Sequence, residues 1–409
     1  MWQSLKNIYH LINAFLANLW FGFPSRRLTV IGVTGTDGKT TTVSLIYHIL
    51  NSAGYNVSMI SSVGAIIGGK NYDIGFHVTT PSPWALQRFI KRAKEHVLNA
   101  GPAARFLILE TTSHALDQYR VWGIKFDIGV LTNVTHEHLD YHKTYDNYVG
   151  TKTKLLKMAK VAVVNRDDKS YKLVKSKVQG KNKKSIKYGL GTNADVNPKL
   201  FPFESNLIGE FNKYNALAAI AVCRESGVDD KVIRKALISY KPPVGREEIV
   251  HKVDFTVMVD FAHTPNAFDQ LLSSIKPSIK GRLIHVFGSA GLRDNTKRPL
   301  MGKVSSRYAD FIVLTAEDPR SESVEKIMNG IESGIMNHEF RIKKGTLLKI
   351  SDRKEAINAA IKMARKGDFV LISGKAHEKS MNYGKGEVPW DEFVVVKEAL
   401  RRRGGKQYV

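Results

Sequence analysis

The sequence predicts an α/β fold in which largely parallel strands alternate with helices. Short apolar runs with the length of strands recur along the chain, and helical patterns lie between most of them. Polar residues follow directly after most of these runs, and parallel sheets bind ligands beyond the carboxyl ends of their strands. The predicted strands are 28–33, 106–109, 128–131, 161–164, 255–259, 283–287, 311–314 and 369–372.

Length and composition predict a globular protein with more than one domain. A chain of 409 residues is expected to form two or three domains, and a hydrophobic content of 43% is enough to build their cores. The segment Pro242-Pro243-Val244-Gly245 is typical of a linker and divides the chain near residue 243. Cys223 is the single cysteine, which excludes an internal disulfide and favours a reducing, cytoplasmic location.

The chain is strongly basic, with a formal net charge of +24. One interpretation is nucleic-acid binding, and the other is a basic surface suited to acidic substrates. The densest run of lysines, Lys172 to Lys187, has few aromatic residues and no helical stripe, so we expect a solvated loop there. No specific nucleic-acid partner is therefore expected.

Residues 1–27 form a separate segment ahead of the first predicted strand. The apolar stretch Ile8 to Phe23 is too short and too interrupted by polar residues to span a bilayer, and no signal-peptide cleavage site follows it. We expect an amphipathic helix docked on the body of the protein, the alternative being a helix that binds a membrane surface or a partner. Its predicted apolar face consists of Ile8, Leu11, Ile12, Phe15 and Leu19.

Residues 34–42, Thr-Gly-Thr-Asp-Gly-Lys-Thr-Thr-Thr, join the first predicted strand to the helical pattern Val43 to Leu50. Such a glycine turn aims backbone N–H groups and the positive end of a helix dipole at a phosphate. Lys39 would reach the β- and γ-phosphates of ATP, and the Thr40 hydroxyl would reach Mg²⁺. The match is to the shorter form G-x-x-G-K-T, and the alternative is a glycine turn before an ordinary helix.

Two further clusters carry groups that could bind metal. Glu110 ends a predicted strand, and a carboxylate beside a phosphate loop suits Mg²⁺, although a surface glutamate is the alternative. The run His136 to His142 alone suggests a metallohydrolase, but Tyr141 separates Asp140 from His142 and a phosphate loop has no place in that class.

A series of ordered motifs gives a more specific hypothesis, because together they resemble the Mur ligase superfamily and most closely its MurE-type ligases. That resemblance implies a P-loop central domain with a mainly parallel sheet over 28–242 and a C-terminal Rossmann-like α/β domain over 243–409. The motifs are Gly35–Thr42, Thr79–Pro81, Glu110–Leu116 with Arg120, Thr132–Asn133 through His142, Leu207–Asn212 with Asn215, Val259–Pro265, Lys297–Pro299, Glu317–Arg320 and Gly374–Glu378.

The resemblance also implies a reaction. The family uses ATP to activate a carboxylate as an acyl phosphate, releasing ADP, and an amine then displaces phosphate. Catalysis of this kind depends on positioning and on cations that stabilise phosphoryl oxygens. The implied product is a muramyl-L-Ala-D-Glu type acceptor extended by a diamino acid, meso-diaminopimelate, in peptidoglycan precursor synthesis.

By resemblance, two Mg²⁺ sites involve Thr40, Glu110, His138 and a carbamylated Lys152. The implied catalytic residues are Lys39, Glu110, His138 and Lys152. Carbamylation would convert the Lys152 ammonium into a carboxylate-like metal ligand, which removes its repulsion from the cation. The alternative for Lys152 is an ordinary surface lysine beside Lys154. The implied ATP-binding residues of the glycine loop are Gly35, Thr36, Asp37, Gly38, Lys39, Thr40 and Thr41. Asn212 and Asn215 would lie near the adenine, and the C-terminal domain would contribute Arg246, Asp260 and His263.

The substrate residues are likewise implied by resemblance. Thr79, Thr80, Thr112 and Arg120 would hold the muramyl peptide. Arg320 could pair bidentately with the second carboxylate of diaminopimelate, which lysine lacks, the alternative being a surface ion pair with Glu322. The full set for the incoming amino acid is Arg298, Glu317, Asp318, Arg320, Gly374 and Glu378.

The sequence departs from the MurE pattern in three places. Only residues 1–27 precede the first predicted strand, where the family has a uridine-binding domain of roughly a hundred residues. We therefore expect either that the protein holds the UDP moiety of the acceptor differently or that the acceptor lacks UDP. The segment from Asn165 to Leu207 is shorter and lysine-rich. Glu317-Asp318 replaces the usual Asp-Asn, and Ala376 replaces a glycine.

Three alternative functions follow. A folylpolyglutamate synthase-like ligase, or another Mur-type ligase with a non-UDP acceptor, would share the architecture. A non-catalytic nucleotide-binding subunit would be free to lose Lys39, Glu110, His138 and Lys152, all of which are present. A nucleic-acid-binding ATPase would bind DNA or RNA with a steep salt dependence.

Overall fold

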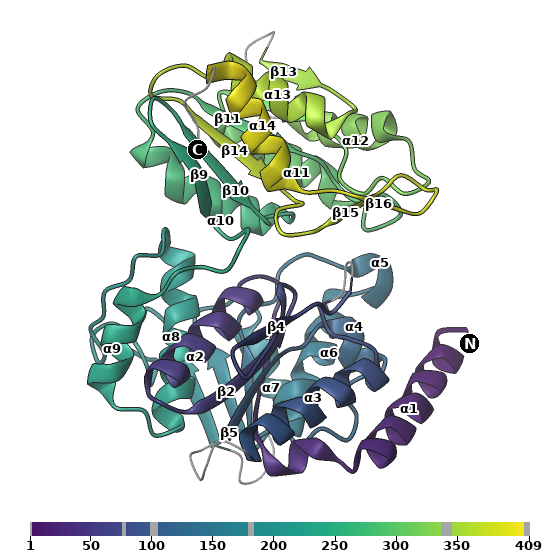
Figure 1. The fold of residues 1–409 in the computed structure, drawn as a ribbon, viewed down its shortest axis with the longest axis vertical. Coiled ribbons are helices and arrows are strands. Elements are labelled where there is room, and N and C mark those ends of the chain that lie inside the picture. The colour runs from purple at the N-terminus through teal and green to yellow at the C-terminus, as the bar shows by residue number, and fades with distance from the viewer. Residues whose placement is uncertain (1, 76–78, 99–104, 179–183, 337–345, 405–409) are drawn as a thin grey trace. The chain divides into compact units, whose positions relative to one another are not determined.

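The computed structural model describes residues 2–75, 79–98, 105–178, 184–336 and 346–404. Two compact units make up the chain. The first comprises Met1–Thr135, His142–Leu207 and Phe211–Lys241, and the second comprises His136–Tyr141, Ile208–Glu210 and Pro242–Val409. Each unit contains a mainly parallel sheet covered by helices, which confirms the predicted α/β fold class (Figure 1).

The first unit is built on an eight-stranded sheet with the order β4-β3-β2-β5-β1-β6-β7-β8. The pairs β2–β5, β5–β1, β1–β6, β6–β7 and β7–β8 are parallel, whereas β2–β3 and β3–β4 are antiparallel, so that β3 runs against the other described strands of this sheet. The strands are β1 (Thr29–Thr34), β2 (Asn56–Ser61), β3 (Gly64–Ile67), β4 (Lys70–Tyr72), β5 (Arg105–Glu110), β6 (Ile128–Leu131), β7 (Val161–Asn165) and β8 (Lys184–Tyr188).

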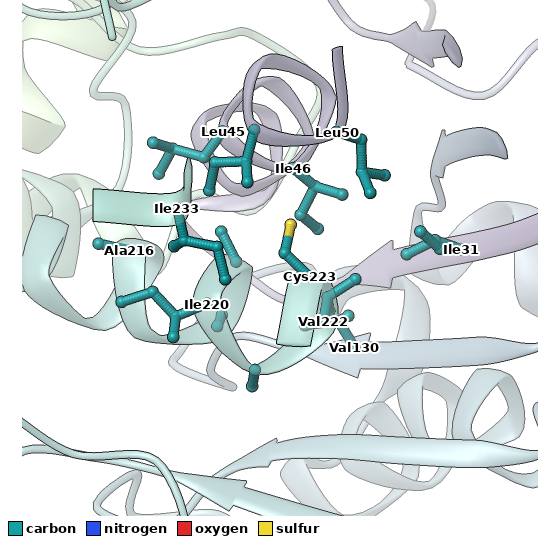
Figure 2. Packing of buried hydrophobic residues seen from close by; sticks show 14 of the residues in the cluster. Ile31, Leu45, Ile46, Leu50, Val130, Ala216, Ile220, Val222, Cys223 and Ile233 are labelled. Carbon is teal, nitrogen blue, oxygen red and sulfur yellow. The ribbon is translucent and has the colours of Figure 1, made fainter. Parts of the chain in front are cut away.

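Helices cover both faces of this sheet because its strands are apolar on both sides. One core layer lies under α2 (Lys39–Ser52), α8 (Glu210–Glu225) and α9 (Asp230–Ser239), and Figure 2 shows their side chains meeting those of two strands. The other lies under α3 (Pro83–Leu98), α4 (Ser113–Asp117) and α6 (Tyr145–Met158). The remaining helices up to residue 241 are α1 (Trp2–Phe21), η1 (Pro24–Arg27), α5 (Leu139–His142) and α7 (Tyr171–Val178).

The second unit repeats the three-layer plan with a six-stranded sheet in the order β13-β12-β11-β14-β10-β9. Helices α10 (Pro265–Ile275), α11 (Lys297–Tyr308) and α12 (Val324–Met336) cover one face, and α13 (Arg353–Met363) and α14 (Glu392–Gly404) cover the other. The other elements are β9 (Glu248–Lys252), β10 (Thr256–Asp260), β11 (Leu283–Phe287), β12 (Phe311–Leu314), β13 (Leu347–Lys349), β14 (Phe369–Ser373), β15 (Ser380–Asn382), β16 (Glu387–Pro389) and η2 (Lys276–Ser278).

All eight predicted strands exist, but the expectation for the lysine-rich stretch was partly wrong. Helix α7 ends at Val178 and strand β8 begins at Lys184, where we expected a loop. Residues 179–183 of that stretch lie outside the described residues. Strand β8 is an edge strand whose first two residues, Lys184 and Ser185, are exposed and whose last residue, Tyr188, is buried, so its polar start disguises the strand in the sequence.

The first helix exists, but the prediction of its docked face was wrong. Ile8, Ile12, Phe15 and Leu19 are all about half exposed, whereas Ala14, Ala17 and Asn18 are fully buried. Helix α1 packs on α3, and the Asn18 amide donates hydrogen bonds to the carbonyl oxygens of Ala14 and Trp122. The packing of α1 on the first unit and the buried hydrogen bonds of Asn18 therefore decide which face of α1 is docked, and that face is not the one that the hydrophobic pattern predicts.

A buried ion pair fixes the interior of the second unit. The Arg353 guanidinium is fully buried, pairs with the Glu392 carboxylate, and donates to the carbonyl oxygens of Ala316 and Ser373. Removing one partner leaves the other charge buried without compensation. We expect Arg353→Ala to lower the free energy of unfolding by about 3–5 kcal/mol in urea titrations. The control Lys354→Ala removes an exposed pair with Glu398 and should cost less than about 1 kcal/mol, and equal losses would contradict the prediction.

Candidate functional site

Polar side chains gather at the carboxyl ends of the strands in each unit, as the sequence predicted. In the first unit, the glycine loop follows β1, Glu110 ends β5, and Thr132 and Asn133 follow β6. In the second unit, the equivalent positions after β10, β12 and β14 carry His263, the run Glu317–Arg320 and the run Gly374–Glu378. Parallel α/β sheets place ligand sites at this edge.

The glycine loop makes contacts too close for any side chain. A Cβ atom at Gly35 would lie 1.7 Å from the Thr132 hydroxyl oxygen, and one at Gly38 would lie 2.2 Å from Asn215 Oδ1. Gly38 also has a φ of +79° and begins α2 as its N-cap, so that the loop turns sharply into the helix. The start of α2 is thus left with backbone rather than a capping side chain, as a phosphate site requires.

Asn133 holds the loop in shape. Its carbonyl oxygen accepts from the Thr36 amide at 2.9 Å, and its side-chain Oδ1 accepts from the Asp37 amide at 2.9 Å. Its Nδ2 donates in turn to the Asp37 carbonyl at 3.1 Å. The Thr36 and Asp37 amides are thus bonded to Asn133, which leaves the amides of the helix start, among them that of Thr41, for a phosphate.

Thr40 and Glu110 form a cluster of oxygen donors beside the loop. The Thr40 hydroxyl donates to Glu110 Oε2 at 3.0 Å, and the Ser62 amide donates to the same oxygen at 3.0 Å. Hydroxyl and carboxylate oxygens are hard ligands that suit Mg²⁺. Within the described residues, no group of three or more His, Cys, Asp or Glu side chains could hold a metal ion, so a site here would draw on the Thr40 hydroxyl as well.

Lys152 is buried against the glycine loop and is not a surface lysine. Only 2% of it is exposed, and its ammonium donates to the Gly35 carbonyl at 2.5 Å and lies 4.5 Å from the centre of the Tyr148 ring. Lys154, two residues further along α6, is exposed and pairs with Asp117 at 3.0 Å. The two lysines of one helix therefore have opposite environments.

His142 extends this cluster with a neutral imidazole. Its Nε2 lies 3.0 Å from the Ser113 hydroxyl. Burial lowers the pKa of His142 to about 4, with further lowering from His114 and the Lys152 ammonium. The ring is therefore uncharged at neutral pH and adds no positive charge beside the loop.

The residues expected to hold a muramyl peptide form one hydrogen-bonded group. The Thr80 hydroxyl is buried, donates to the Glu110 carbonyl at 3.1 Å and accepts from the Thr112 amide at 3.1 Å. Thr112 caps α4, and Arg120 donates to the Thr80 carbonyl at 3.3 Å. Thr79 is half-buried next to them.

Asn212 and Asn215 lie on the first turns of α8, both buried. The Asn215 side-chain amide donates to Asn212 Oδ1 at 2.9 Å, and Asn215 Oδ1 accepts from the Thr42 hydroxyl at 3.3 Å. Asn215 also lies directly against Gly38 and so supports the start of α2. We expected Asn215 near the adenine from the sequence and did not include this contact.

In the second unit, an aromatic group surrounds the nucleotide residues predicted there. The Arg246 guanidinium lies 4.5 Å from the centre of the Phe261 ring, and His263 packs edge-on against the same ring. The Asp260 carboxylate is buried and accepts from the Glu247 and Ala262 amides at 2.7 and 2.6 Å. Burial raises the pKa of Asp260, although Arg246 and these amides oppose that shift.

A compact network of charges joins the residues expected to meet the incoming amino acid. The Lys375 ammonium is fully buried and pairs with Asp318 at 2.8 Å and with Glu378 at 2.6 Å. The Glu317 carboxylate lies against Gly374, where a Cβ atom would come within 2.2 Å of Glu317 Oε2. Asp318 and Arg320 both have left-handed backbones, with φ of +46° and +53°, and such strain is concentrated at functional sites.

The two arginines of this region have different partners from those the sequence suggested. Glu322, the alternative partner of Arg320, accepts a bidentate pair from Arg298 at 2.7 and 2.8 Å. Arg298 is buried, so it anchors the loop around Glu322. Arg320 is half-buried and donates to the Gly291 carbonyl at 2.5 Å.

The segment His136–Tyr141 belongs to the second unit. Glu137 is buried and accepts from the Lys297 ammonium at 3.1 Å, and His136 Nε2 lies 3.1 Å from the Thr296 hydroxyl. His138 has a φ of +57°, and its Nδ1 lies 3.9 Å from Glu137 Oε1. The neighbours therefore fix the backbone on which His138 is presented.

Glu317 should give the second unit a pH-dependent stability. Burial raises the pKa of its carboxyl group to about 7, although Lys297 and Arg353 oppose the shift. A raised carboxyl pKa stabilises the fold below the ordinary pKa of 4.5, and that stabilisation is lost as the pH rises from 4.5 to 7. Glu317→Gln should remove this slope, worth up to about 3 kcal/mol, in urea unfolding at pH 4.5 to 8. The exposed control Glu325→Gln should keep the wild-type slope, and an unchanged slope in Glu317→Gln would contradict the assignment.

Sequence reasoning missed three residues that hold the site together. Ser62 follows β2, a strand that was not predicted, and Asn133 was quoted only as part of a motif. Lys375 was likewise treated as part of the Gly374–Glu378 motif, although it is the centre of the charge network. The available signal was position, since Asn133 and Lys375 each follow the end of a predicted strand.

Comparisons with known proteins match both units. Residues 33–223 match the family described as the Mur ligase middle domain, and residues 245–376 match the Mur ligase, glutamate ligase domain. A UDP-N-acetylmuramoyl-L-alanyl-D-glutamate--2,6-diaminopimelate ligase from Aquifex aeolicus is 39% identical over 94% of this chain and 80% of its own length. A UDP-N-acetylmuramyl-tripeptide synthetase from Roseiflexus is 36% identical over 95% of this chain and 82% of its own length.

Solved structures give the same picture of the architecture. A UDP-N-acetylmuramoyl-L-alanyl-D-glutamate--2,6-diaminopimelate ligase superposes with a TM-score of 0.59 at 30% identity, over 92% of this chain and 78% of that one. A Mycobacterium tuberculosis folylpolyglutamate synthase, in complexes with ADP and AMPPCP, gives a TM-score of 0.69 at 16% identity, over 97% of this chain and 96% of that one. The latter likeness concerns the fold alone.

Proposed function

The chain belongs to the Mur ligase family, and from that premise we propose that it is an ATP-dependent, ADP-forming amide ligase of peptidoglycan precursor synthesis. The proposed reaction joins meso-diaminopimelate to a muramyl-L-Ala-D-Glu type acceptor in the cytoplasm. The observation that carries the proposal is the 39% identity over 94% of the chain to a ligase of that name, which extends through both units.

The proposed chemistry proceeds in two displacements. An oxygen of the acceptor's γ-carboxylate attacks the γ-phosphorus of ATP, and the bond to the departing ADP oxygen breaks. The amine nitrogen of the incoming amino acid then attacks the acyl carbon, the bond from that carbon to the phosphate oxygen breaks, and the nitrogen releases a proton. Negative charge develops on phosphoryl oxygens in the first displacement, so the protein's main task is to position and stabilise them.

The residues around the glycine loop fit this task. Gly35 and Gly38 let the loop approach a phosphate closely, and the amides at the start of α2, from Gly38 to Thr41, would bind its oxygens. Lys39 would supply a positive charge to the β- and γ-phosphates from the first turn of α2.

Two Mg²⁺ ions would be held by oxygen and nitrogen donors of this chain, and they would neutralise charge on the phosphate oxygens. Thr40 and Glu110 present a hydroxyl and a carboxylate 3.0 Å apart and would hold one of them. A carbamylated Lys152 would contribute to the second, for which the resemblance also implies His138. A carbamate at Lys152 fits its burial because the modification replaces a buried ammonium with a group that a metal ion can neutralise.

The second unit would bind the incoming amino acid. Glu317, Asp318 and Glu378 supply carboxylates for its ammonium groups, and Arg320 supplies a guanidinium for a carboxylate. Gly374 provides the space in which Glu317 lies. Arg246, Asp260 and His263 would contact the nucleotide from this unit, with Phe261 as a planar surface among them.

The function can be tested by measuring ADP release with purified protein, ATP, Mg²⁺ and UDP-MurNAc-L-Ala-D-Glu, with a panel of amines. We expect release with meso-diaminopimelate and little with L-lysine. A parallel reaction with the MurNAc dipeptide lacking UDP tests the acceptor, and Lys39→Ala serves as the inactive control. The proposal would be overturned if no amine gave ADP release with either muramyl acceptor and the protein instead added glutamate to a folate.

A further inference from the structure

The first helix carries an apolar stripe on the side that faces away from the body of the first unit. Its side chains are between 45% and 77% exposed. At 100° per residue the stripe covers roughly 120° of the helix circumference, which is the width of a membrane-binding face. It consists of Ile8, Tyr9, Ile12, Leu16, Leu19 and Trp20, and Phe15 borders it on the side where its ring packs against Trp122 of the body.

The opposite side of α1 is firmly attached, so the stripe is presented on a fixed support. Asn18 is buried and bonded to the Trp122 carbonyl at 2.7 Å, and the Trp84 indole N–H donates to Asn13 Oδ1 at 3.2 Å. Phe21 packs edge-on against Trp84. Figure 1 shows α1 lying alongside α3 in the first unit. Burial of the polar Asn18 together with exposure of the large apolar residues means that the fold itself selects this presentation.

The segment that carries the stripe has basic but no acidic residues, and the Asp117 carboxylate accepts a hydrogen bond from Asn7 of α1 at 3.3 Å. No Asp or Glu occurs before Asp37, whereas Lys6, Arg26 and Arg27 are exposed. Tyr9 and Trp20 lie along one edge of the stripe, and their rings combine an apolar body with a polar tip. Such aromatic residues are enriched where a membrane surface meets water.

We propose that α1 attaches this protein to the surface of an anionic lipid bilayer. The stripe would enter the boundary between headgroups and acyl chains, while Lys6, Arg26 and Arg27 contact anionic headgroups. Anionic lipid explains both halves of the observation, since it offers apolar volume for the stripe and negative charge for the basic residues. A second copy of the chain would bring the same basic residues to the interface and would offer them no carboxylate from this segment.

The attachment is peripheral. None of the helices in the described part of the chain has the length and apolarity that crossing a bilayer requires. Binding should therefore be reversible and should weaken with salt, because headgroup attraction is screened within about a Debye length.

Vesicle flotation tests the proposal with the full chain. We expect the protein to float with vesicles of phosphatidylcholine containing one third phosphatidylglycerol, and to bind pure phosphatidylcholine much more weakly. The triple variant Ile12→Ser, Leu16→Ser, Leu19→Ser should reduce the bound fraction by more than about tenfold. Lys6→Ser, Arg26→Ser and Arg27→Ser should each weaken binding to anionic vesicles by about fivefold.

The matched control is Leu200→Ser, Ile238→Ser, Val253→Ser, which removes three exposed apolar side chains elsewhere on the surface. It should float like the wild type. Circular dichroism and ADP release in solution should be unchanged in every variant, which separates loss of attachment from loss of folding or of the proposed ligase function. Failure of the wild type to float, or equal loss in stripe and control variants, would overturn the proposal. The proposal would also be overturned if light scattering showed a dimer of the wild type that dissociates in the stripe variant.

Discussion

Lys152→Ala is expected to reduce ADP formation by roughly 10²- to 10³-fold, the cost of removing one preorganised stabiliser of a charged transition state. The physical reason lies in the position of Lys152, buried on α6 with its Nζ 2.5 Å from the Gly35 carbonyl at the glycine loop. As a carbamate it would carry a negative charge to a metal ion at this position, and alanine supplies none. Steady-state coupled assays of ADP release measure the loss.

Rescue distinguishes a carbamate from an ammonium. Acetate or formate can occupy the space left by Lys152→Ala and replace the carboxylate-like group, so part of the activity should return as their concentration rises. Chloride at equal ionic strength should not restore it. Lys154→Ala is the matched control, because Lys154 lies on the same helix but is exposed and pairs with Asp117. Unchanged activity in Lys152→Ala would contradict a metal-ligand role, and loss without carboxylate rescue would contradict the carbamate.

The sequence predicted the parts of the fold whose hydrophobic signal is local. Central strands such as 128–131 and 283–287 were predicted to the residue, because strands buried on both faces read as continuous apolar runs. Edge strands were not predicted, because their exposed side carries polar residues that interrupt the apolar run. Strand β8, which begins with the exposed Lys184 and Ser185, is one example and the short hairpin strand β4 is another. The buried strand β2 was missed as well, although it is not at an edge.

Contacts between distant segments could not be read from the sequence. The orientation of α1 depends on its packing on α3 and on the partner of Asn18, which is 104 residues away. The hydrophobic pattern carries neither fact. Similarly, the burial of Lys152 could not be distinguished from the exposure of Lys154, because both lie within one turn of a helix whose environment is set by the glycine loop.

One departure from the family pattern has a structural consequence. Ala376 stands where the resemblance implies glycine, and its φ of +41° lies in the left-handed region that favours glycine. Its methyl group also lies where Gly245 approaches, since a Cβ atom there would come within 2.7 Å of the Ala376 Cβ. Ala376 therefore adopts a backbone conformation that glycine would adopt more readily, so this turn next to Lys375 is held at the cost of local strain.

Arg320→Ala is expected to remove the preference for diaminopimelate over lysine. Arg320 is half-buried. Burial and, to a lesser degree, the neighbouring Arg293 lower the pKa of its guanidinium, whereas the carboxylates of Asp318, Glu387 and Glu378 oppose that shift. A carboxylate on the substrate would compensate the half-buried guanidinium, and a bidentate pair fixes its orientation. Loss of a hydrogen-bonded charge pair costs about 1.5–3 kcal/mol, so kcat/KM for diaminopimelate should fall about 10- to 100-fold. The value for lysine, which has no second carboxylate, should change little.

Arg320→Lys separates charge from geometry, because lysine keeps the positive charge but not the planar fork of donors. We expect it to recover only part of the preference. Arg307→Ala, which removes an exposed arginine paired with Asp269, should leave both amines unaffected. The contact of Arg320 with the Gly291 carbonyl provides a second role, in holding the loop. Equal losses for diaminopimelate and lysine would assign Arg320 to that structural role, whereas a loss confined to diaminopimelate requires that its guanidinium meets the second carboxylate.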